Sequence, residues 1–282
     1  MIILKTEPEI ALMRVAGRIL ADLLTELAQE VRPGITTGEL EALADRRIRE
    51  ANCSPTFRGQ PGMVSHAPPY PAATCISINE EVIHGIPGPR VLQDGDLVSI
   101  DCGVTWKGWI ADAALSVVAG EPSPEISRLV RTTRRSLEEA VAKARPGARL
   151  GDVSFAVQQW AMAEGLGVVR EFCGHGVGRS LHEDPPIPNY GSPGTGPVLR
   201  PGMTLAVEPM FTLGNPEVRV QKDGWTVVTR DRKPAAHFEY TLLVTTDGCE
   251  VLTPWRLPPT QAPVGTFPVP PGSSTPPTPP GR

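Results

Sequence analysis

Four acidic residues and one histidine lie in sequence settings that suit a metal site: Asp101, Asp112, His175, Glu208 and Glu239. Two of the carboxylates end mainly apolar, strand-like runs, a third precedes such a run, and a fourth lies among isoleucine and alanine. Unpaired charges are costly to bury in such surroundings. The neighbouring sequence offers no matching set of lysines or arginines. A pair of divalent cations would supply the missing positive charge.

The spacing of Asp101 and Asp112 predicts a β-hairpin, because the two residues flank the turn-like stretch 106–109. A hairpin folded near Trp106–Lys107 would set the two carboxylates opposite each other, with Cβ atoms roughly 5 Å apart. Two bare carboxylates that close repel, so that one would stay protonated. A cation between them removes this penalty.

The other ligand candidates also have favourable neighbours. His175 lies in the glycine-rich stretch 173–178, where the backbone can approach closely. Glu208 is followed by Pro209, which cannot donate to a ladder and so marks the end of a strand. Four carboxylates and one imidazole form an oxygen-rich set without thiolates. Such a set suits two ions of manganese, iron(II), cobalt, nickel or zinc better than a tetrahedral structural zinc.

The elements that must position these residues recur along the chain. A helix is predicted over residues 7–31, followed by Pro33-Gly34 and by a capping box at Thr36 that opens a second helix. Further on, a helix starts at residues 123–125, ends before Pro146-Gly147, and is followed by a fourth helix from residue 151. The two Pro-Gly turns are 113 residues apart.

A second similarity relates residues 95–101 to residues 202–208, at an offset of 107. The two offsets, 113 and 107, differ by six residues. The first half therefore contains extra residues, which we assign to the stretch 60–69. We therefore predict two related halves that bring four carboxylates to one central site. The alternative is a chance similarity of turn residues, since Pro-Gly turns are common.

Composition excludes several classes of protein. The chain has 282 residues, 40% of them hydrophobic, and a net charge of −4, which gives no basic footprint for nucleic acid. The five cysteines are scattered and odd in number, which favours reduced thiols in the cytoplasm. The N-terminal apolar stretch is too short for a signal peptide, and no apolar run is long enough to span a bilayer.

The C-terminal region differs from the rest. Residues 254–282 contain 11 prolines, so we expect one domain over residues 1–255 and a disordered tail over 256–282. Partner binding through a P-x-x-P motif is the alternative.

Taken together, these residues resemble those of the type I methionine aminopeptidases of peptidase family M24, in the bacterial form without an N-terminal zinc-binding extension. The resemblance covers roughly residues 5–253. The matching motifs lie at residues 76–87, 95–103, 174–178 with His182-Glu183, 207–210 and 222–226.

The resemblance implies the α+β pita-bread fold, in which two pseudo-symmetric halves form a curved antiparallel sheet covered by helices around a central dimetal site. Asp101 would hold one metal ion, His175 and Glu208 would complete the other, and Asp112 and Glu239 would bridge the two. A dimetal-activated water would attack the first peptide bond. His182 would stabilise the oxyanion, His84 would contact the scissile nitrogen, and Glu208 would shuttle the proton.

The resemblance also implies that His84 and His182 bind substrate, and that His84 contributes to a methionine pocket. Its other predicted residues are Tyr70, Cys75, Leu181 and Trp225. An unbranched thioether suits such an apolar slot. Leu181 stands where the family often has phenylalanine, and residues 62–69 replace a shorter family segment. His66 and His237 have no supporting motif and are interpreted as non-catalytic, although His237 precedes Glu239 by two residues, on the same predicted strand face.

The predicted activity is removal of the N-terminal methionine from nascent chains by a cytoplasmic monomer, with transient ribosome contact. A first alternative is an Xaa-Pro peptidase, which shares the five ligands. Such relatives usually carry an extra N-terminal domain, for which we expect no room before the helix at residue 7. A second alternative is a protein-binding relative without metal, which would not need four desolvated carboxylates.

Overall fold

The computed structural model describes residues 1–62 and 67–258. The helices are α1 (Glu7–Glu30), α2 (Thr37–Glu50), α3 (Pro124–Lys143) and α4 (Leu150–Ala163). The strands are β1 (Ser54–Pro55), β2 (Thr74–Ile78), β3 (Glu81–Ile83), β4 (Leu97–Trp106), β5 (Trp109–Val118), β6 (Gly167–Val168), β7 (Gly174–Gly176), β8 (Glu183–Ile187), β9 (Thr204–Val207), β10 (Met210–Thr212), β11 (Val218–Val220), β12 (Val227–Thr229), β13 (Ala235–His237), β14 (Tyr240–Val244) and β15 (Cys249–Val251).

Local signals explain the four helices, which lie where the sequence predicts them. Thr36 caps α2 by accepting a hydrogen bond from the Glu39 amide, and the Glu39 carboxylate accepts from the Thr36 amide in return. Ser123 caps α3 in the same position, accepting from the Ile126 amide. Each helix buries one apolar face in the main core. In the part of the chain that is described, none of them is both long and apolar enough to cross a membrane.

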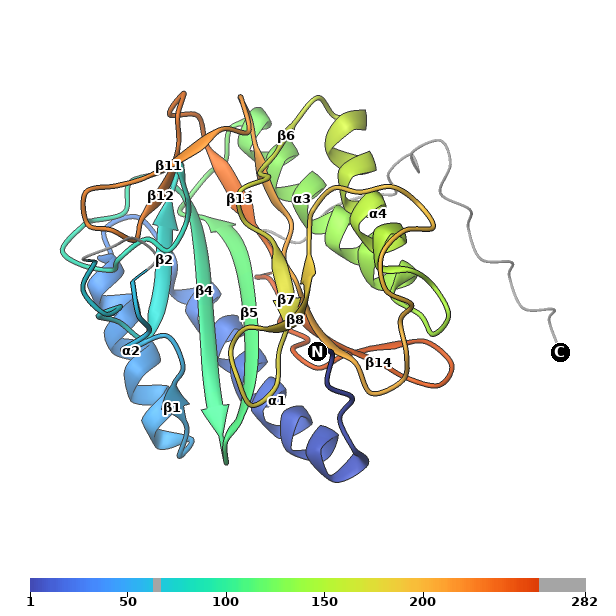
Figure 1. The fold of residues 1–282 in the computed structure, drawn as a ribbon. Coiled ribbons are helices and arrows are strands. Elements are labelled where there is room, and N and C mark those ends of the chain that lie inside the picture. The colour runs from blue at the N-terminus through green and yellow to red at the C-terminus, as the bar shows by residue number, and fades with distance from the viewer. Residues whose placement is uncertain (63–66, 259–282) are drawn as a thin grey trace, which may run out of the picture.

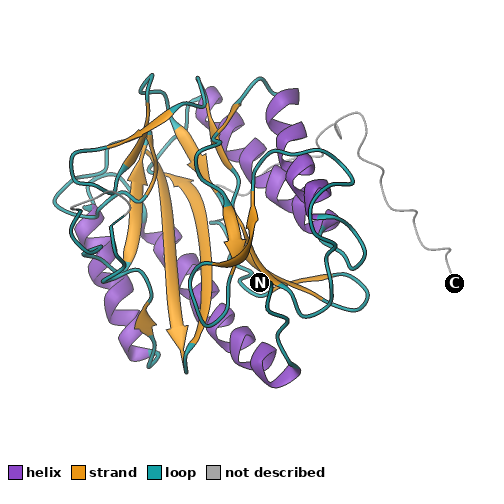
Figure 2. Ribbon diagram, viewed as in Figure 1, coloured by secondary structure: helices purple, strands orange, loops and turns teal. Residues whose placement is uncertain are grey.

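The strands form antiparallel ladders throughout the described residues. One sheet has β4 at its centre, paired with β1, β2 and β5. A second has the order β15-β14-β9-β7-β8. Two smaller sheets, β13-β10-β6 and β11-β12-β3, complete the fold. In the view of Figure 1, α2 lies to the left of the strands, α1 crosses behind β4 and β5, and α3 and α4 lie to the right; Figure 2 shows the same arrangement coloured by secondary structure.

Backbone hydrogen bonds repeat in the two halves and confirm the predicted pseudo-symmetry. The Gly34 amide donates to the Leu92 carbonyl, and the Gly147 amide donates to the Leu199 carbonyl. A second matching pair follows, Thr37 N to Arg90 O and Leu150 N to Pro197 O. The donors differ by 113 residues and the acceptors by 107, so the six extra residues lie between position 37 and position 90. The assigned stretch 60–69 falls inside this interval.

The predicted hairpin is present, but its register differs from the prediction. The turn residues are Lys107 and Gly108, both with positive φ, and Trp106 pairs with Trp109. Asp101 consequently pairs with Ala114 rather than with Asp112. Strand β4 also continues to Trp106, so Asp101 lies within the strand and not at its end. The two carboxylates remain on one face of the sheet as diagonal neighbours, which still brings them to the same site.

The C-terminal part of the described chain belongs to the core. Trp255 is buried, stacks on Tyr240 at a centroid distance of 4.7 Å, and donates from its indole nitrogen to the Glu239 carbonyl. Residues 259–282, which include nearly all of the predicted tail, lie outside the described residues.

A substitution at Gly17 tests the packing of α1. Alanine normally stabilises a helix relative to glycine by about 1 kcal/mol. Here a Cβ at residue 17 would lie 2.2 Å from the Leu252 carbonyl oxygen, so we expect Gly17→Ala to lower the free energy of unfolding by about 1–3 kcal/mol. Urea denaturation measures the difference. Ala11→Gly, at an exposed site on the same helix, is the control and should cost only about 1 kcal/mol. A Gly17→Ala protein as stable as the parent would contradict this packing.

Candidate active site

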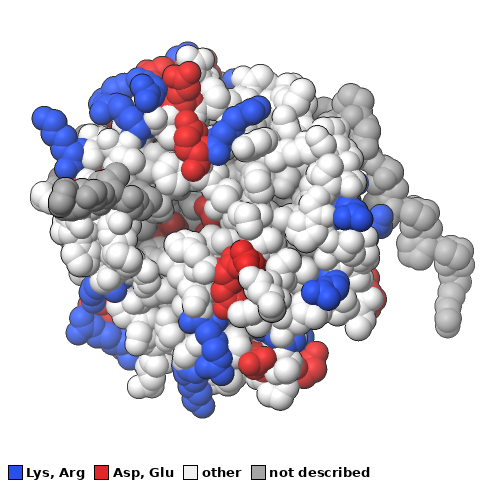
Figure 3. Space-filling view, in the orientation of Figure 1, with Lys and Arg blue, Asp and Glu red and all other residues white. Residues whose placement is uncertain are grey.

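A cavity of about 350 Å³ opens between the two halves. Its walls include every residue that the sequence analysis assigned to metal, substrate or catalysis: Tyr70, Cys75, His84, Asp101, Asp112, His175, Leu181, His182, Glu208, Trp225 and Glu239. Six further residues complete the lining: Phe57, Gln60, Pro61, Ile83, Phe172 and Cys173. In Figure 3, acidic atoms are visible inside a hollow near the middle of the face shown. The predicted set therefore converges on one place.

Both halves supply carboxylates to the cavity. Asp101 and Asp112 come from the hairpin β4–β5, Glu208 follows β9, and Glu239 precedes β14. The Glu239 amide donates to the Ala114 carbonyl of β5. Next to it, the Thr241 hydroxyl lies 3.0 Å from the Asp112 amide and 2.7 Å from the Asp112 carbonyl. These bonds join β5 of one half to β14 of the other and fix the relative positions of Asp112 and Glu239.

His175 is oriented with one ring nitrogen toward the carboxylates. Its Nδ1 lies 2.9 Å from the Gly176 carbonyl oxygen. This contact favours the tautomer with the proton on Nδ1 and leaves the Nε2 lone pair free for a ligand. Nε2 lies 3.8 Å from Asp112 Oδ2 and 3.8 Å from Glu208 Oε1.

Burial and mutual repulsion perturb the ionisable groups of the cavity. Burial, and then the neighbouring carboxylates, raise the pKa of Asp101, Glu208 and Glu239 well above the ordinary range. Burial raises the pKa of Asp112 to about 7. Burial also lowers the pKa of His175 to about 4, so its imidazole is neutral near pH 7. A cluster of this kind is costly without an added positive charge.

The donor set fits divalent cations. Asp112, His175 and Glu239 each offer a ligand atom, and these three atoms lie within 4.8 Å of one another. Asp101 Oδ1, Asp112 Oδ1 and Glu239 Oε1 are buried without a hydrogen-bond partner among the described residues. Orphaned carboxylate oxygens that converge beside a neutral imidazole are the arrangement expected for a site of oxygen and nitrogen ligands.

Aromatic side chains and His84 form the opposite wall. Tyr70 and Trp225 pack edge to face with centroids 4.9 Å apart, and the His84 ring stands edge-on to both Trp225 and Phe172. His84 has a φ of +59°, a left-handed conformation that is uncommon outside glycine. Strain of this kind tends to occur at functional sites. Cys75 lies buried beside this wall.

His182 lies on the rim of the cavity, in the loop between β7 and β8. Its ring meets the ring of His175 edge to face, with centroids 4.4 Å apart. The loop is held by Glu183, which accepts hydrogen bonds from the amides of Arg179 and Ser180 and forms a buried ion pair with Lys5 at 2.6 Å. The N-terminal segment therefore supports the loop that carries Leu181 and His182.

Phe57, Gln60, Pro61 and Tyr70, which lie between β1 and β2, form the outer wall of the cavity, near the place where the sequence departs from the resembled family. The Tyr70 amide donates to the Gln60 carbonyl and closes the base of the segment. The Trp225 indole donates to the Pro68 carbonyl. His66, interpreted as non-catalytic, lies outside the described residues.

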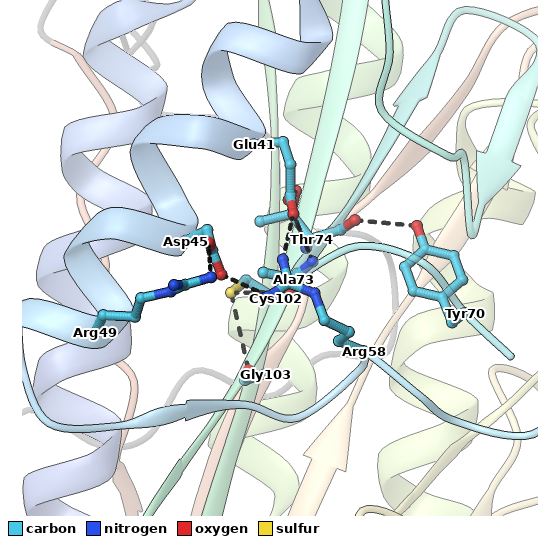
Figure 4. Close-up of polar contacts among 9 residues, drawn as sticks. All are labelled: Glu41, Asp45, Arg49, Arg58, Tyr70, Ala73, Thr74, Cys102 and Gly103. Atoms are coloured by element: carbon cyan, nitrogen blue, oxygen red, sulfur yellow. Dashed lines mark hydrogen bonds and ion pairs between the residues drawn. The ribbon is translucent and has the colours of Figure 1, made fainter.

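Glu41 of α2 anchors the inner end of this wall, a role that the sequence did not reveal. Its carboxylate accepts from the amides of Ala73 and Thr74 and from the Thr74 hydroxyl, at 2.6 to 3.0 Å. Arg58 lies 3.1 Å from the same carboxylate. Figure 4 shows Glu41 pointing from its helix to this segment. The charge-rich helix α2 thus has one acidic residue turned inward.

Phe57 and Phe172 line the cavity but were not predicted from the sequence. Phe57 and Phe172 lie in loops without hydrophobic periodicity. His237 was interpreted as sharing a strand face with Glu239, but β13 ends at His237 and Glu239 lies between β13 and β14. The His237 side chain is nevertheless buried, with Nε2 3.5 Å from Glu208 Oε2.

Comparison with known proteins places this site in a family. Residues 11–246 match the family model of metallopeptidase family M24. The chain belongs to metallopeptidase family M24. The chain is 49% identical to a methionine aminopeptidase of Clostridium perfringens over 253 residues, which cover 90% of this chain and 99% of the relative. The resemblance predicted from the sequence motifs is confirmed.

Solved structures of this family agree with the fold. A methionine aminopeptidase from Thermotoga maritima superimposes with a TM-score of 0.85 at 46% identity, covering 90% of this chain and 99% of the other. A prolidase from Pyrococcus furiosus gives a TM-score of 0.68 at 21% identity, covering 90% of this chain and 66% of the other. At this identity the likeness to the prolidase shows a common fold and nothing further. The α+β pita-bread fold of the M24 family is therefore confirmed.

Glu41→Gln tests whether α2 anchors the cavity wall. The neutral amide keeps the size of the side chain but weakens three hydrogen bonds to a carboxylate, so we expect the free energy of unfolding to fall by about 2 kcal/mol. Urea denaturation gives the value. Asp22→Asn, an exposed acid on α1, is the matched control and should change stability by less than about 0.5 kcal/mol. Equal effects of the two substitutions would argue against the anchor.

Metal-dependent stabilisation should increase with pH. Burial raises the pKa of Asp112 to about 7 in the folded, metal-free protein, whereas the unfolded chain keeps the ordinary, lower value. The folded state therefore holds this proton more tightly than the unfolded state. The free energy of unfolding falls as pH rises from the unfolded pKa toward about 7. A divalent cation must displace that proton, whereas His175 is already neutral above its pKa of about 4. The rise in Tm caused by Mn²⁺ should therefore be larger at pH 7.5 than at pH 5.5. Differential scanning fluorimetry with Mn²⁺ and with EDTA at equal ionic strength measures it, and a rise independent of pH would exclude the coupling.

Proposed function

We propose that this chain is a methionine aminopeptidase that removes the N-terminal methionine from nascent proteins and peptides. The observation that carries the proposal is the 49% identity to a methionine aminopeptidase over nearly the whole relative, together with a cavity that gathers all the expected groups. The enzyme is a metal-dependent hydrolase. Water adds to the first peptide carbonyl, the C–N bond breaks, and methionine and a shortened peptide are released.

In this proposal five residues would hold two divalent ions. Asp101 would contribute to one, His175 and Glu208 to the other, and Asp112 and Glu239 would be shared. The buried, unpartnered oxygens of Asp101, Asp112 and Glu239 support this assignment. When bound, the ions supply positive charge and lower the pKa of water toward neutrality. The candidates are cobalt, manganese, iron(II), nickel and zinc.

The remaining polar groups handle the proton and the peptide bond. Glu208 holds the proton taken from water and passes it to the leaving amine, a role that suits a carboxyl whose pKa burial has raised. His84 contacts the scissile nitrogen, and its left-handed backbone fixes the ring beside Trp225. His182, on the rim next to His175, donates to the carbonyl oxygen as negative charge develops.

The methionine side chain binds between Tyr70, Cys75, Leu181 and Trp225, with His84 at one side. These four residues belong to one buried apolar cluster, which supports the assignment. An unbranched thioether fits such a slot and contacts aromatic edges favourably. Leu181 is smaller than phenylalanine, so the pocket has more room for the substrate side chain beside this residue.

The setting of the enzyme follows from the same proposal. All five cysteines are free thiols, in agreement with a reducing cytoplasm. We propose that the protein works as a monomer and meets nascent chains in transient contact with the ribosome. Sedimentation and co-sedimentation with ribosomes test these two points separately.

Paired peptides distinguish this function from the alternatives. Metal-free protein is incubated with Met-Ala-Ser and Ala-Pro-Ser after addition of Mn²⁺, Fe²⁺ or Co²⁺, and products are read by mass spectrometry. Loss of methionine alone is expected, because the prolidase similarity extends to the fold only. Cleavage of Ala-Pro-Ser instead would favour an Xaa-Pro peptidase. Cleavage of neither peptide with any metal would favour a binding role.

Asp112→Asn tests the shared ligand. The amide keeps the shape but removes the charge from a carboxylate that is buried beside His175, so metal affinity and turnover should fall together, each by at least about tenfold. Isothermal titration with Mn²⁺ and the Met-Ala-Ser assay measure both. Asp247→Asn, an exposed acid outside the cavity, should leave both unchanged. An Asp112→Asn enzyme with full activity and two bound ions would exclude the bridging role.

A further inference from the structure

Behind Glu208 lies a buried histidine, His237, to which the proposed chemistry assigns no role. His237 ends β13, has an exposed fraction of 1%, and is not among the residues that line the cavity. Its Nε2 lies 3.5 Å from Glu208 Oε2. The other carboxylate oxygen, Oε1, lies 3.8 Å from His175 Nε2. Glu208 therefore stands between two imidazoles, one on the cavity wall and one behind it.

The backbone of His237 is fixed by the first half of the chain. The buried Ser116 hydroxyl donates to the His237 carbonyl at 2.8 Å and accepts from the His237 amide at 2.9 Å. Ser99 of β4 lies 2.7 Å from the same hydroxyl. These bonds hold His237 at a set distance from the hairpin that carries Asp101 and Asp112.

The backbone of Glu208 is fixed as well. Pro209 follows it, and the buried Asn189 side chain donates to the Glu208 carbonyl at 2.9 Å. Across the β10–β13 ladder, Met210 pairs with His237. Glu208 lies two residues before Met210, so the β10–β13 ladder places it close to His237. What remains adjustable is the rotation of the two side chains.

An imidazole in this place is costly unless it has a function. Both ring nitrogens of His237 are buried without a hydrogen-bond partner among the described residues. Each buried, unsatisfied polar atom costs about 1–3 kcal/mol. An apolar side chain of similar size would fill the space without that cost. Glu208 Oε2 is the group within reach of Nε2, and closing the gap by about half an ångström gives an ordinary hydrogen bond.

We propose that His237 is a positioning residue for Glu208: its Nε2–H donates to Oε2 and so keeps Oε1 turned toward the metal centre. Without this hydrogen bond, Glu208 can rotate or present both oxygens to one ion. The proposal rests on the proposed function, since it takes Glu208 as a metal ligand. It adds a residue for which neither the sequence motifs nor the ligand set gave a role.

The test uses the full chain and Co²⁺ as the probe. His237→Leu removes the donor and keeps an apolar volume, whereas His237→Gln keeps an N–H donor. Metal-free proteins are titrated with Co²⁺ without oxygen, by calorimetry and by the visible absorption of the bound ion. We expect His237→Leu to bind Co²⁺ about tenfold or more weakly, with an altered absorption band, because supporting residues of metal ligands typically have effects of this size. His237→Gln should stay within about threefold of the parent and keep its band.

Controls separate positioning from a general loss of stability. Thr133→Val removes a buried hydroxyl that donates to the Leu129 carbonyl of α3. Thr133 does not line the cavity, so this variant should leave Co²⁺ binding unchanged. If His237→Leu does not fold, His237→Met takes its place. Unchanged affinity and absorption in the Leu or Met variant would overturn the proposal. Equal weakening in the Gln and Leu variants would also overturn it, because packing alone would explain the effect.

The same titration distinguishes failure of this inference from failure of the proposed function. A parent protein that binds no Co²⁺ would refute the metal centre, and the role of His237 with it. A parent that binds Co²⁺ while His237→Leu binds it equally well would refute the role of His237 alone.

Discussion

Mutual repulsion among buried carboxylates is the constraint on which the rest of the structure depends. Four of them meet at a cavity of about 350 Å³, and burial together with their neighbours raises the pKa of Asp101, Glu208 and Glu239. A cluster of this kind is unfavourable for folding unless protons or cations neutralise it. The carboxylate cluster therefore lowers the stability of the metal-free chain and raises its affinity for cations. The rigidity of the surrounding strands keeps the carboxylates from moving apart.

That rigidity comes from the joining of two similar halves. Each half supplies two carboxylates, and neither half alone forms the site. The contacts of Thr241 with Asp112 and of Glu239 with Ala114 cross the boundary between β5 and β14. Because these bonds involve Asp112 and Glu239 themselves, the docking of the two halves also sets the positions of these two carboxylates in the cavity.

Features encoded by neighbouring residues could be predicted from the sequence. The four helices followed from capping residues and Pro-Gly turns, which act within a few positions. The acidic residues that line the cavity could be picked out because each lies in or beside an apolar run. The hairpin register was wrong because the turn was placed near Trp106–Lys107, whereas Lys107 and Gly108 both adopt positive φ and close a two-residue turn. A difference of one turn position moves the partner of Asp101 from Asp112 to Ala114.

Features that depend on distant partners could not be predicted. The pattern around Glu41 is that of an exposed helix face, and only the folded chain shows its carboxylate bonded to Ala73 and Thr74. Likewise, His237 follows no motif, and its proximity to Glu208 arises from the pairing of β10 with β13. Side chains that support a site contact residues far along the chain, so local patterns carry little information about them.

The symmetric and asymmetric parts of the chain have different tasks. The repeated backbone bonds, such as Gly34 to Leu92 and Gly147 to Leu199, hold equivalent segments in both halves. The outer wall of the cavity lies in the first half, where the Trp225 indole donates to the Pro68 carbonyl. Because this wall is attached at a few points and the centre is held from both halves, changes in the wall can alter which peptides enter without disturbing the ligands. The place where the sequence departs from the resembled family is thus the place where the fold tolerates a departure.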